Sequence, residues 1–307
     1  MTSTQRSKTP ARTAPAGTVG GLRTRILSVD GHGPTVLLLH GFSDSADSWR
    51  AVMDLLHEAD RRAIAVDLPH HGRAERPPHG SFLSVTDQFV DAAIAQFDTG
   101  DGVVLVGNSV GGLAALRAAQ RSLDHLNSVL AIGPAGIHTP WWMSAVHSTK
   151  RFGTPIARHA TVPLIRGTLT GPRLIAAGFG YAVARGHLSA TAKAQYASHW
   201  GPGDLHRQLL LGSDTIDELV HPDALPCKPF AVPVEVVWGA HDWICPARGA
   251  SVIYERYPEV RVQVLDDTGH CPQYDRPELV ASLILADAAR PSAEAAERDS
   301  LPGKETS

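Results

Sequence analysis

The sequence has few cysteines and no long apolar run, and each absence excludes a class of protein. Three cysteines in 307 residues (Cys227, Cys245 and Cys271) are too few for a disulfide framework, so a reducing compartment is expected. No apolar run approaches the roughly 20 residues that span a bilayer, and the first residues lack the apolar core of a secretory signal. The sequence therefore predicts a cytoplasmic protein without a membrane span.

Strong charge of one sign and the common cofactor motifs are also missing. The chain carries 28 Lys and Arg against 31 Asp and Glu, a formal net charge of −3, which gives no reason to expect nucleic acid as a partner. His70, His71 and His79 are not accompanied by ligands at metal-binding spacing, so we assign them to loop packing. The glycines after Gly107 are not followed by the Lys of a phosphate loop. We expect no metal, no cofactor and a small-molecule substrate; the sequence indicates no oligomeric state.

What the chain does contain is a regular alternation of strand and helix patterns. Short apolar runs rich in β-branched residues predict buried strands, and apolar residues at helical spacing predict the helices between them. The expected strands are 22–29, 35–39, 62–67, 103–106, 128–133, 234–238 and 260–265, and the expected helices are 49–56, 85–97, 113–119, 247–257 and 277–289. This order predicts an α/β fold with a mostly parallel central sheet flanked by helices.

The alternation is interrupted once. Between residues 135 and 226 there are only short helical patterns separated by helix breakers, with no convincing buried strand. We interpret this segment as a helical cap inserted into one α/β domain made of residues 22–134 and 227–290. The polar ends, 1–21 and 291–307, are predicted to be disordered tails.

A serine lies where a predicted strand turns into a predicted helix. The turn reads Gly107-Asn108-Ser109-Val110-Gly111, and a strand, a tight turn with a central serine and a helix are the setting of a nucleophile elbow. Small residues at 107 and 111 let the strand and the helix pack closely. The alternative is an ordinary glycine-rich turn that happens to contain a serine.

Two more polar residues follow predicted strands and separate these interpretations. Asp242 follows the strand 234–238, and His270 follows the strand 260–265. Because the carboxyl ends of parallel strands meet at one edge of a sheet, we expect Ser109, Asp242 and His270 to come together as nucleophile, acid and base. Asp266 and Asp267 are closer to the histidine in sequence and are alternatives for the acid.

An acyl-transfer site also needs donors for the developing oxyanion. We expect the backbone N–H of Val110, which follows the serine, and that of Phe42 in the loop after the strand 35–39. His40 is expected to brace this loop by hydrogen bonding. Trp141 and Trp142 open the inserted segment; they either line an apolar substrate cleft or pack the segment against the body, and both interpretations stay open.

Five motifs in order make the chain resemble the α/β-hydrolase superfamily over residues 22–290. They are His40-Gly41-Phe42, Asp67-Leu68-Pro69-His70-His71-Gly72-Arg73, Gly107 to Gly112, Trp238-Gly239-Ala240-His241-Asp242 with Pro246, and Thr268-Gly269-His270 followed by Pro277-Glu278. The resemblance implies the α/β-hydrolase fold, a triad of Ser109, Asp242 and His270, and a cap at 135–226. A serine at 109, where haloalkane dehalogenases and epoxide hydrolases attack through a carboxylate, sets the chain apart from those relatives.

The motifs also indicate a reaction class. Asn108 and the run 132–136 resemble the meta-cleavage product hydrolases, which cut C–C bonds, although those enzymes carry Trp where this chain has Cys271. Asn108, Trp141 and Trp142 are candidates for substrate binding. We expect a serine hydrolase that cleaves a carboxylic ester or similar acyl bond of a small to medium apolar substrate. The alternatives are C–C bond hydrolysis, acyl transfer to peroxide or an alcohol, and a ligand receptor on a hydrolase scaffold.

Overall fold

The computed structural model describes residues 12–13, 16–77, 79–145, 147–148, 178, 190, 211–212 and 215–288. The strands are β1 Arg12–Thr13, β2 Gly17–Val19, β3 Leu22–Thr24, β4 Ile26–Val29, β5 His32–Leu39, β6 Arg61–Val66, β7 Val103–Asn108, β8 Leu126–Ile132, β9 Val234–Gly239 and β10 Arg261–Leu265. The helices are α1 Arg50–Glu58, α2 Phe82–Phe97, α3 Val110–Ala119, α8 Arg248–Arg256, α9 Pro272–Asp275 and α10 Pro277–Ala288, with short 3₁₀ turns η1 at Ala46–Trp49 and η2 at Pro222–Ala224.

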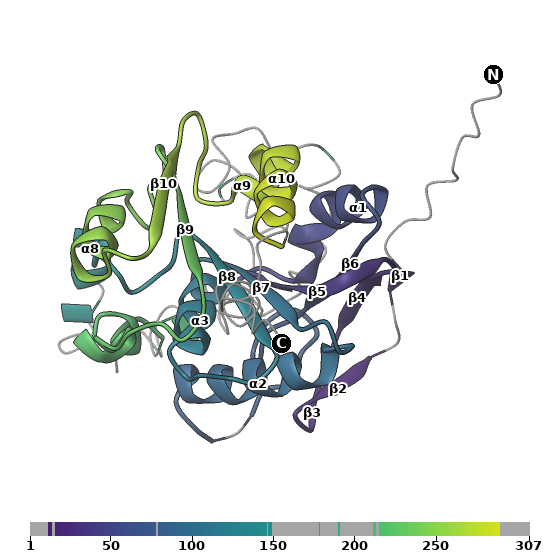
Figure 1. The fold of residues 1–307 in the computed structure, drawn as a ribbon. Coiled ribbons are helices and arrows are strands. Elements are labelled where there is room, and N and C mark those ends of the chain that lie inside the picture. Colours follow the sequence, from purple (N-terminus) through teal and green to yellow (C-terminus); the bar gives the residue numbers. More distant parts are fainter. Residues whose placement is uncertain are drawn as a thin grey trace, which may run out of the picture.

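An eight-stranded sheet forms the centre of the molecule (Figure 1). Its strand order is β1-β4-β6-β5-β7-β8-β9-β10. All neighbours from β6 to β10 pair in parallel, whereas β1 and β4 join one edge antiparallel. Parallel strands need crossovers, and the helices between them supply these connections. The predicted α/β fold with a mostly parallel sheet is confirmed.

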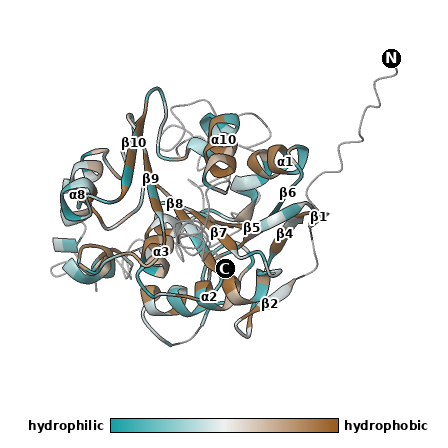
Figure 2. Cartoon of the chain, in the orientation of Figure 1, coloured by the Kyte–Doolittle hydropathy of each residue, from teal (hydrophilic) through white to brown (hydrophobic). Residues whose placement is uncertain are grey.

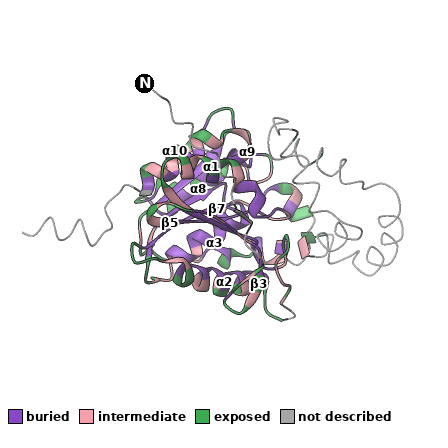
Figure 3. Ribbon diagram, turned by 90° about the vertical axis from the view of Figure 1, so that its right-hand side faces the viewer, coloured by how far each residue is buried: buried purple, intermediate pink, exposed green. Residues whose placement is uncertain are grey.

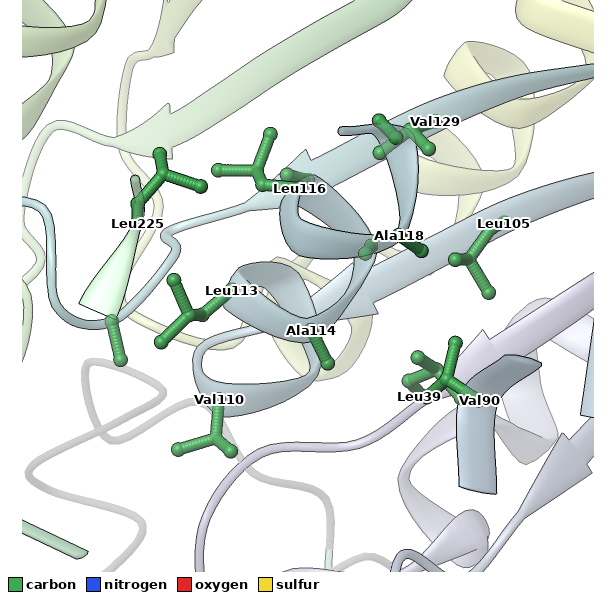
Figure 4. Packing of buried hydrophobic residues seen from close by; sticks show 14 of the residues in the cluster. Leu39, Val90, Leu105, Val110, Leu113, Ala114, Leu116, Ala118, Val129 and Leu225 are labelled. Carbon is green, nitrogen blue, oxygen red and sulfur yellow. The ribbon is translucent and has the colours of Figure 1, made fainter. Parts of the chain in front are cut away.

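Alternate residues of the central strands feed two separate apolar cores, one on each face. On β5, Leu37 and Leu39 pack against α2 and α3, whereas Val36 and Leu38 pack against α1 and α10. β7 and β9 are accordingly buried along their whole length, and the helices present exposed surfaces outside the sheet (Figures 2 and 3). Figure 4 shows Val110, Leu113 and Leu116 of α3 among the apolar side chains that fix this helix over the sheet. The carboxyl ends of β5, β7, β9 and β10 are therefore held rigidly.

The structure corrects two predictions at the start of the chain. Residues 1–21 were expected to be a disordered tail, of which residues 1–11 and 14–15 lie outside the described residues; in the described part, β2 pairs with β3 as an antiparallel ribbon and β1 pairs with the sheet. Gly20 and Gly21, with φ of 56° and 83°, form the tight turn between β2 and β3. The boundary expected at residue 21 falls within this turn. The strand expected over 22–29 is divided into β3 and β4.

Most of the predicted cap lies outside the described residues, as do residues 291–307 of the predicted C-terminal tail. Apart from residues 178 and 190, the described parts of the inserted segment are its two ends, where residues 141–145 and 215–219 are helical. In the portion of the chain that the structure describes, no helix combines the length and the apolar character needed to cross a bilayer.

Candidate active site

Ser109 occupies a strained turn between β7 and α3. Its backbone has φ 57° and ψ −115°, a conformation that costs a residue with a side chain roughly 1–3 kcal/mol. The turn is held by hydrogen bonds from Ser109 N–H to the Ile132 carbonyl (2.9 Å) and from Ala135 N–H to the Ser109 carbonyl (3.0 Å). A Cβ at Gly107 would lie 2.1 Å from the Gly111 carbonyl oxygen, so the turn requires glycine there. The predicted elbow is thus present in the backbone.

Asp242 and His270 form a buried pair beside this turn. His270 Nδ1 lies 2.7 Å from Asp242 Oδ2, and both side chains are buried. The other carboxylate oxygen accepts the N–H groups of Ile244 (2.9 Å) and Cys245 (2.8 Å), which fixes its orientation. With Nδ1–H donating to the carboxylate, Nε2 is left as the basic nitrogen of the ring.

The alternative acids, Asp266 and Asp267, differ from Asp242 in position. Asp266 and Asp267 are both exposed, whereas the carboxylate that contacts His270 belongs to Asp242. The loops after β9 and β10 approach closely enough that a Cβ at Gly239 would lie 2.1 Å from the Gly269 carbonyl oxygen. Because Gly239 has no side chain, the two loops can approach, and Asp242 reaches His270, which is 28 residues later in the chain.

The loop after β5 passes directly beside the serine. A Cβ at Gly41 would lie 3.2 Å from Ser109 Cβ, so the backbone of residues 41 and 42 borders Ser109. Val110 is the first residue of α3, and the first N–H groups of a helix have no carbonyl partner within it. Neither the Phe42 N–H nor the Val110 N–H donates a hydrogen bond within the described part of the chain. Both expected oxyanion donors are placed next to Ser109.

A buried network of charged side chains anchors the residues that follow β5. Arg25 donates to both oxygens of Asp67 (3.0 Å each) and to Asp47 Oδ2 (2.7 Å). Asp67 also accepts the backbone N–H groups of Ala46 and Arg73 (2.8 Å each). Burial lowers the pKa of the Arg25 guanidinium, but the two carboxylates outweigh this and raise it. The network was not expected from the sequence, because Arg25 is 42 residues from Asp67.

The histidines near the loop are neutral braces. His40 accepts the Leu68 N–H at Nε2 (2.9 Å), and its Nδ1 lies 2.7 Å from the Gly41 carbonyl oxygen, the bracing that was expected. His71 contacts the rings of His40, Phe42 and Phe82. Burial, with a smaller contribution from His40, lowers the pKa of His71 to about 3. Among the described residues, no three His, Cys, Asp or Glu side chains are grouped as metal ligands.

Two buried thiols lie against the elbow. Cys271 Sγ donates to Asn108 Oδ1 at 3.3 Å, and the Cys245 thiol lies near enough to Ser109 for the serine to affect its pKa. Burial raises the pKa of both thiols, and the Asp242 carboxylate adds to the effect on Cys245. Both residues are therefore protonated, unreactive neighbours of the serine. The contact between Cys245 and Ser109 was not foreseen in the sequence.

The three candidates for substrate binding are placed differently from one another. The Asn108 side chain is completely buried and bonded to protein groups, so it presents no surface to a substrate. Trp142 is half-buried against the apolar core on the α2 and α3 side, which fits the packing interpretation. Trp141 is 83% exposed and does not pack there.

The end of the inserted segment is anchored by polar contacts that the sequence did not reveal. Glu218 accepts the N–H groups of Phe82 (2.7 Å) and Leu83 (2.8 Å) at the start of α2. Arg117 of α3 donates to the Ala224 carbonyl oxygen (2.7 Å) and pairs with Asp87. The helix that begins at the serine thus also holds the chain where it returns to the sheet.

Comparison with known proteins gives the family of this chain. The model of the Alpha/beta hydrolase family matches residues 36–283. The dihydrolipoyllysine-residue acetyltransferase component of the acetoin cleaving system of Pseudomonas putida is 30% identical over 271 residues, which cover 87% of this chain and 67% of that protein. Human monoacylglycerol lipase ABHD6 is 24% identical over 269 residues, 83% of this chain and 75% of the lipase.

Solved structures show the same fold at low identity. The epoxide hydrolase of Bacillus megaterium superposes with a TM-score of 0.69 at 20% identity, covering 90% of this chain and 100% of that one. Cfl2 of Burkholderia cenocepacia gives a TM-score of 0.71 at 20% identity, covering 91% and 96%. Together with the family match over most of its length, the sheet and the elbow described above show that this chain belongs to the alpha/beta hydrolase family.

Proposed function

We propose that the protein is a serine hydrolase that cleaves a carboxylic ester or similar acyl bond of a small to medium apolar substrate through an acyl-enzyme. The observation that carries the proposal is the 2.7 Å contact between His270 and Asp242 beside a serine in the elbow conformation. Acyl transfer requires a nucleophile, an oriented base and N–H donors for the oxyanion, and the Phe42 and Val110 N–H groups have no acceptor within the described residues.

The proposed mechanism uses each group once. Ser109 Oγ attacks the substrate carbonyl carbon while His270 Nε2 takes the hydroxyl proton, and Asp242 stabilises the imidazolium that forms. The N–H groups of Phe42 and Val110 bind the oxyanion of the tetrahedral intermediate. As the intermediate collapses, the imidazolium gives its proton to the leaving alcohol. Water, deprotonated by the same histidine, then attacks the acyl-serine and releases the acid and Ser109.

The test is turnover of a chain-length series of p-nitrophenyl esters by the wild type and by Ser109→Ala. We expect the substitution to reduce kcat by about 10³-fold or more, with an unchanged unfolding temperature. The matched control is Ser282→Ala, which removes an exposed hydroxyl of α10 that bonds only the Leu279 carbonyl within the described chain. Full activity of Ser109→Ala would refute the mechanism.

A second candidate is acyl transfer to an acceptor other than water. This reaction shares every step up to the acyl-enzyme. The similarity to an acetyltransferase component named above supports it as the second candidate. Adding an alcohol or thiol to the ester assay distinguishes the two, because a transferase forms the new ester or thioester in preference to the free acid. A dienone consumed faster than any ester would instead indicate C–C bond hydrolysis, and failure of Ser109 to label with a fluorophosphonate would indicate a receptor.

We infer a cytoplasmic location for this activity. All three cysteines are free, and Cys245 and Cys271 are buried thiols beside the serine. Free thiols at these positions suit a reducing compartment.

A further inference from the structure

The Asn108 carboxamide, next to the proposed nucleophile, makes four hydrogen bonds. Asn108 is the last residue of β7, directly before Ser109, and its exposure is 0%. Its Nδ2 donates to the carbonyl oxygens of His270 (2.8 Å) and Ile132 (3.2 Å). Its Oδ1 accepts from Gln273 Nε2 (3.1 Å) and Cys271 Sγ (3.3 Å). Two donors and two acceptor sites are the full capacity of an amide, and all of them are used.

Three of these four partners belong to one short segment, residues 270–273. This segment follows β10 and carries the base, and it is 162 to 165 residues from Asn108 in the chain. A bond to the His270 carbonyl acts on the backbone of the base itself. The amide therefore ties the strand that ends at the nucleophile to the turn that presents the imidazole.

The chemistry of the contacts requires an amide at this position. A carboxylate would direct oxygens at the carbonyl groups of His270 and Ile132 and repel both. An apolar side chain of the same shape would leave the His270 carbonyl and the Gln273 amide N–H without the bonds that Asn108 supplies, while the Ile132 carbonyl would keep only its bond from the Ser109 N–H. Gln273 is itself fully buried, and its Oε1 has no hydrogen-bond partner within the described chain. The described surroundings of this turn therefore offer no further polar group that could replace the Asn108 amide.

We propose that Asn108 is a positioning residue, which sets the distance and angle between His270 and Ser109 through its hydrogen bonds to residues 270–273. The proposal rests on the proposed serine mechanism. It assigns Asn108 a different role from the substrate binding that its place before the serine suggests, because the side chain acts only on protein groups.

The experiment compares Asn108→Leu with Asn127→Leu, in the wild type and in a His270→Ala background. Asn127 is the matched control, because its Nδ2 donates to the Asp101 carbonyl (2.8 Å) at the opposite end of the neighbouring strand β8. We expect Asn108→Leu to lower kcat by about 100-fold with KM nearly unchanged, as for a misplaced catalytic group. Asn127→Leu should stay within about twofold of the wild type.

The double variants separate positioning from general damage. If Asn108 acts through the base, Asn108→Leu adds no further loss once His270 is alanine, whereas a general structural defect gives a loss that multiplies. The acid limb of the pH profile of kcat/KM, which reports the base, should also move in Asn108→Leu and not in Asn127→Leu. Should Asn108→Leu fail to fold, Gln273→Leu removes one partner only, and we expect a kcat loss of roughly tenfold, the equivalent of one hydrogen bond.

The outcomes are distinguishable. Wild-type turnover that does not depend on Ser109 would refute the proposed function, and this inference with it. Ser109-dependent turnover that survives Asn108→Leu at the wild-type kcat would refute the positioning role alone. A loss of the same factor in the His270→Ala background would also overturn it.

Discussion

Two buried polar networks flank the serine, and they are built from opposite chemistry. On one side Arg25, Asp47 and Asp67 hold the loop that carries Phe42 through ion pairs of 2.7 to 3.0 Å. On the other side the amides of Asn108 and Gln273, with one thiol, hold the turn that carries His270. The first network is charged and the second is neutral.

The difference predicts two kinds of failure. Removing one partner of a buried ion pair leaves an uncompensated charge and costs about 3–5 kcal/mol, so damage to the charged network reduces the free energy of unfolding. Removing one neutral partner costs about 1–3 kcal/mol, which a domain of this size tolerates. Damage to the neutral network is therefore expected to appear as lost alignment of the base in a folded protein.

The largest expected effect is that of Asp67→Asn. The amide places N–H groups where the carboxylate accepted four donors and leaves Arg25 with Asp47 alone. We expect the free energy of unfolding to fall by about 3–5 kcal/mol, measured by urea denaturation at pH 7. A loss below about 1 kcal/mol, the range of an exposed pair, would show that burial of this network adds nothing.

The elements and the contact between Asp242 and His270 were predictable because each has a local signal. Buried strands read as apolar runs, and the elbow has glycine on both sides of Ser109. Asp242 was expected beside His270 because parallel strands deliver their carboxyl ends to one edge, but Asp266 and Asp267 stayed open as alternatives until the 2.7 Å contact of His270 with Asp242 was seen. These features depend on residues that are near one another in the chain or repeat along the sheet.

The two networks were not predictable, because their members are far apart in the sequence. Arg25 finds Asp67 across 42 residues, and Asn108 finds Gln273 across 165. The sequence does not show which distant partner a polar residue will contact in the folded protein. Asn108 was therefore interpreted as a substrate contact, whereas the structure shows its side chain buried. The early ribbon of β2 and β3 was missed because its turn lies inside a segment whose composition is that of a tail.

His71 lies beside the loop that the charged network holds, and it is neutral at pH 7 but can be protonated at lower pH. Its folded-state pKa, lowered by burial to about 3, lies below the ordinary 6.5, so the unfolded chain binds the proton first and stability falls as pH drops below about 6.5. We expect this group to remove about 2 kcal/mol between pH 7 and pH 5. His71→Asn keeps a donor for the Pro69 carbonyl, which His71 Nδ1 contacts at 2.9 Å.

The measurement is urea denaturation of both proteins at the two pH values. The variant should lose less stability on acidification than the wild type by that amount. Equal losses in both proteins would assign the pH dependence to other groups.

The smallest expected effect is that of Glu75→Gln, which tests whether burial or charge gives the Arg25 network its strength. Glu75 pairs with Arg23 at 3.6 Å, but the two side chains are 38% and 76% exposed, so water screens the attraction. The backbone bond from Glu75 N–H to the Arg23 carbonyl (2.7 Å) stays in the variant. We therefore expect a change within about 0.5 kcal/mol in the same denaturation assay, and less at high salt. A loss as large as that of Asp67→Asn would mean that charge pairing in this part of the chain stabilises the fold regardless of burial, and the contrast between the two networks would then fail.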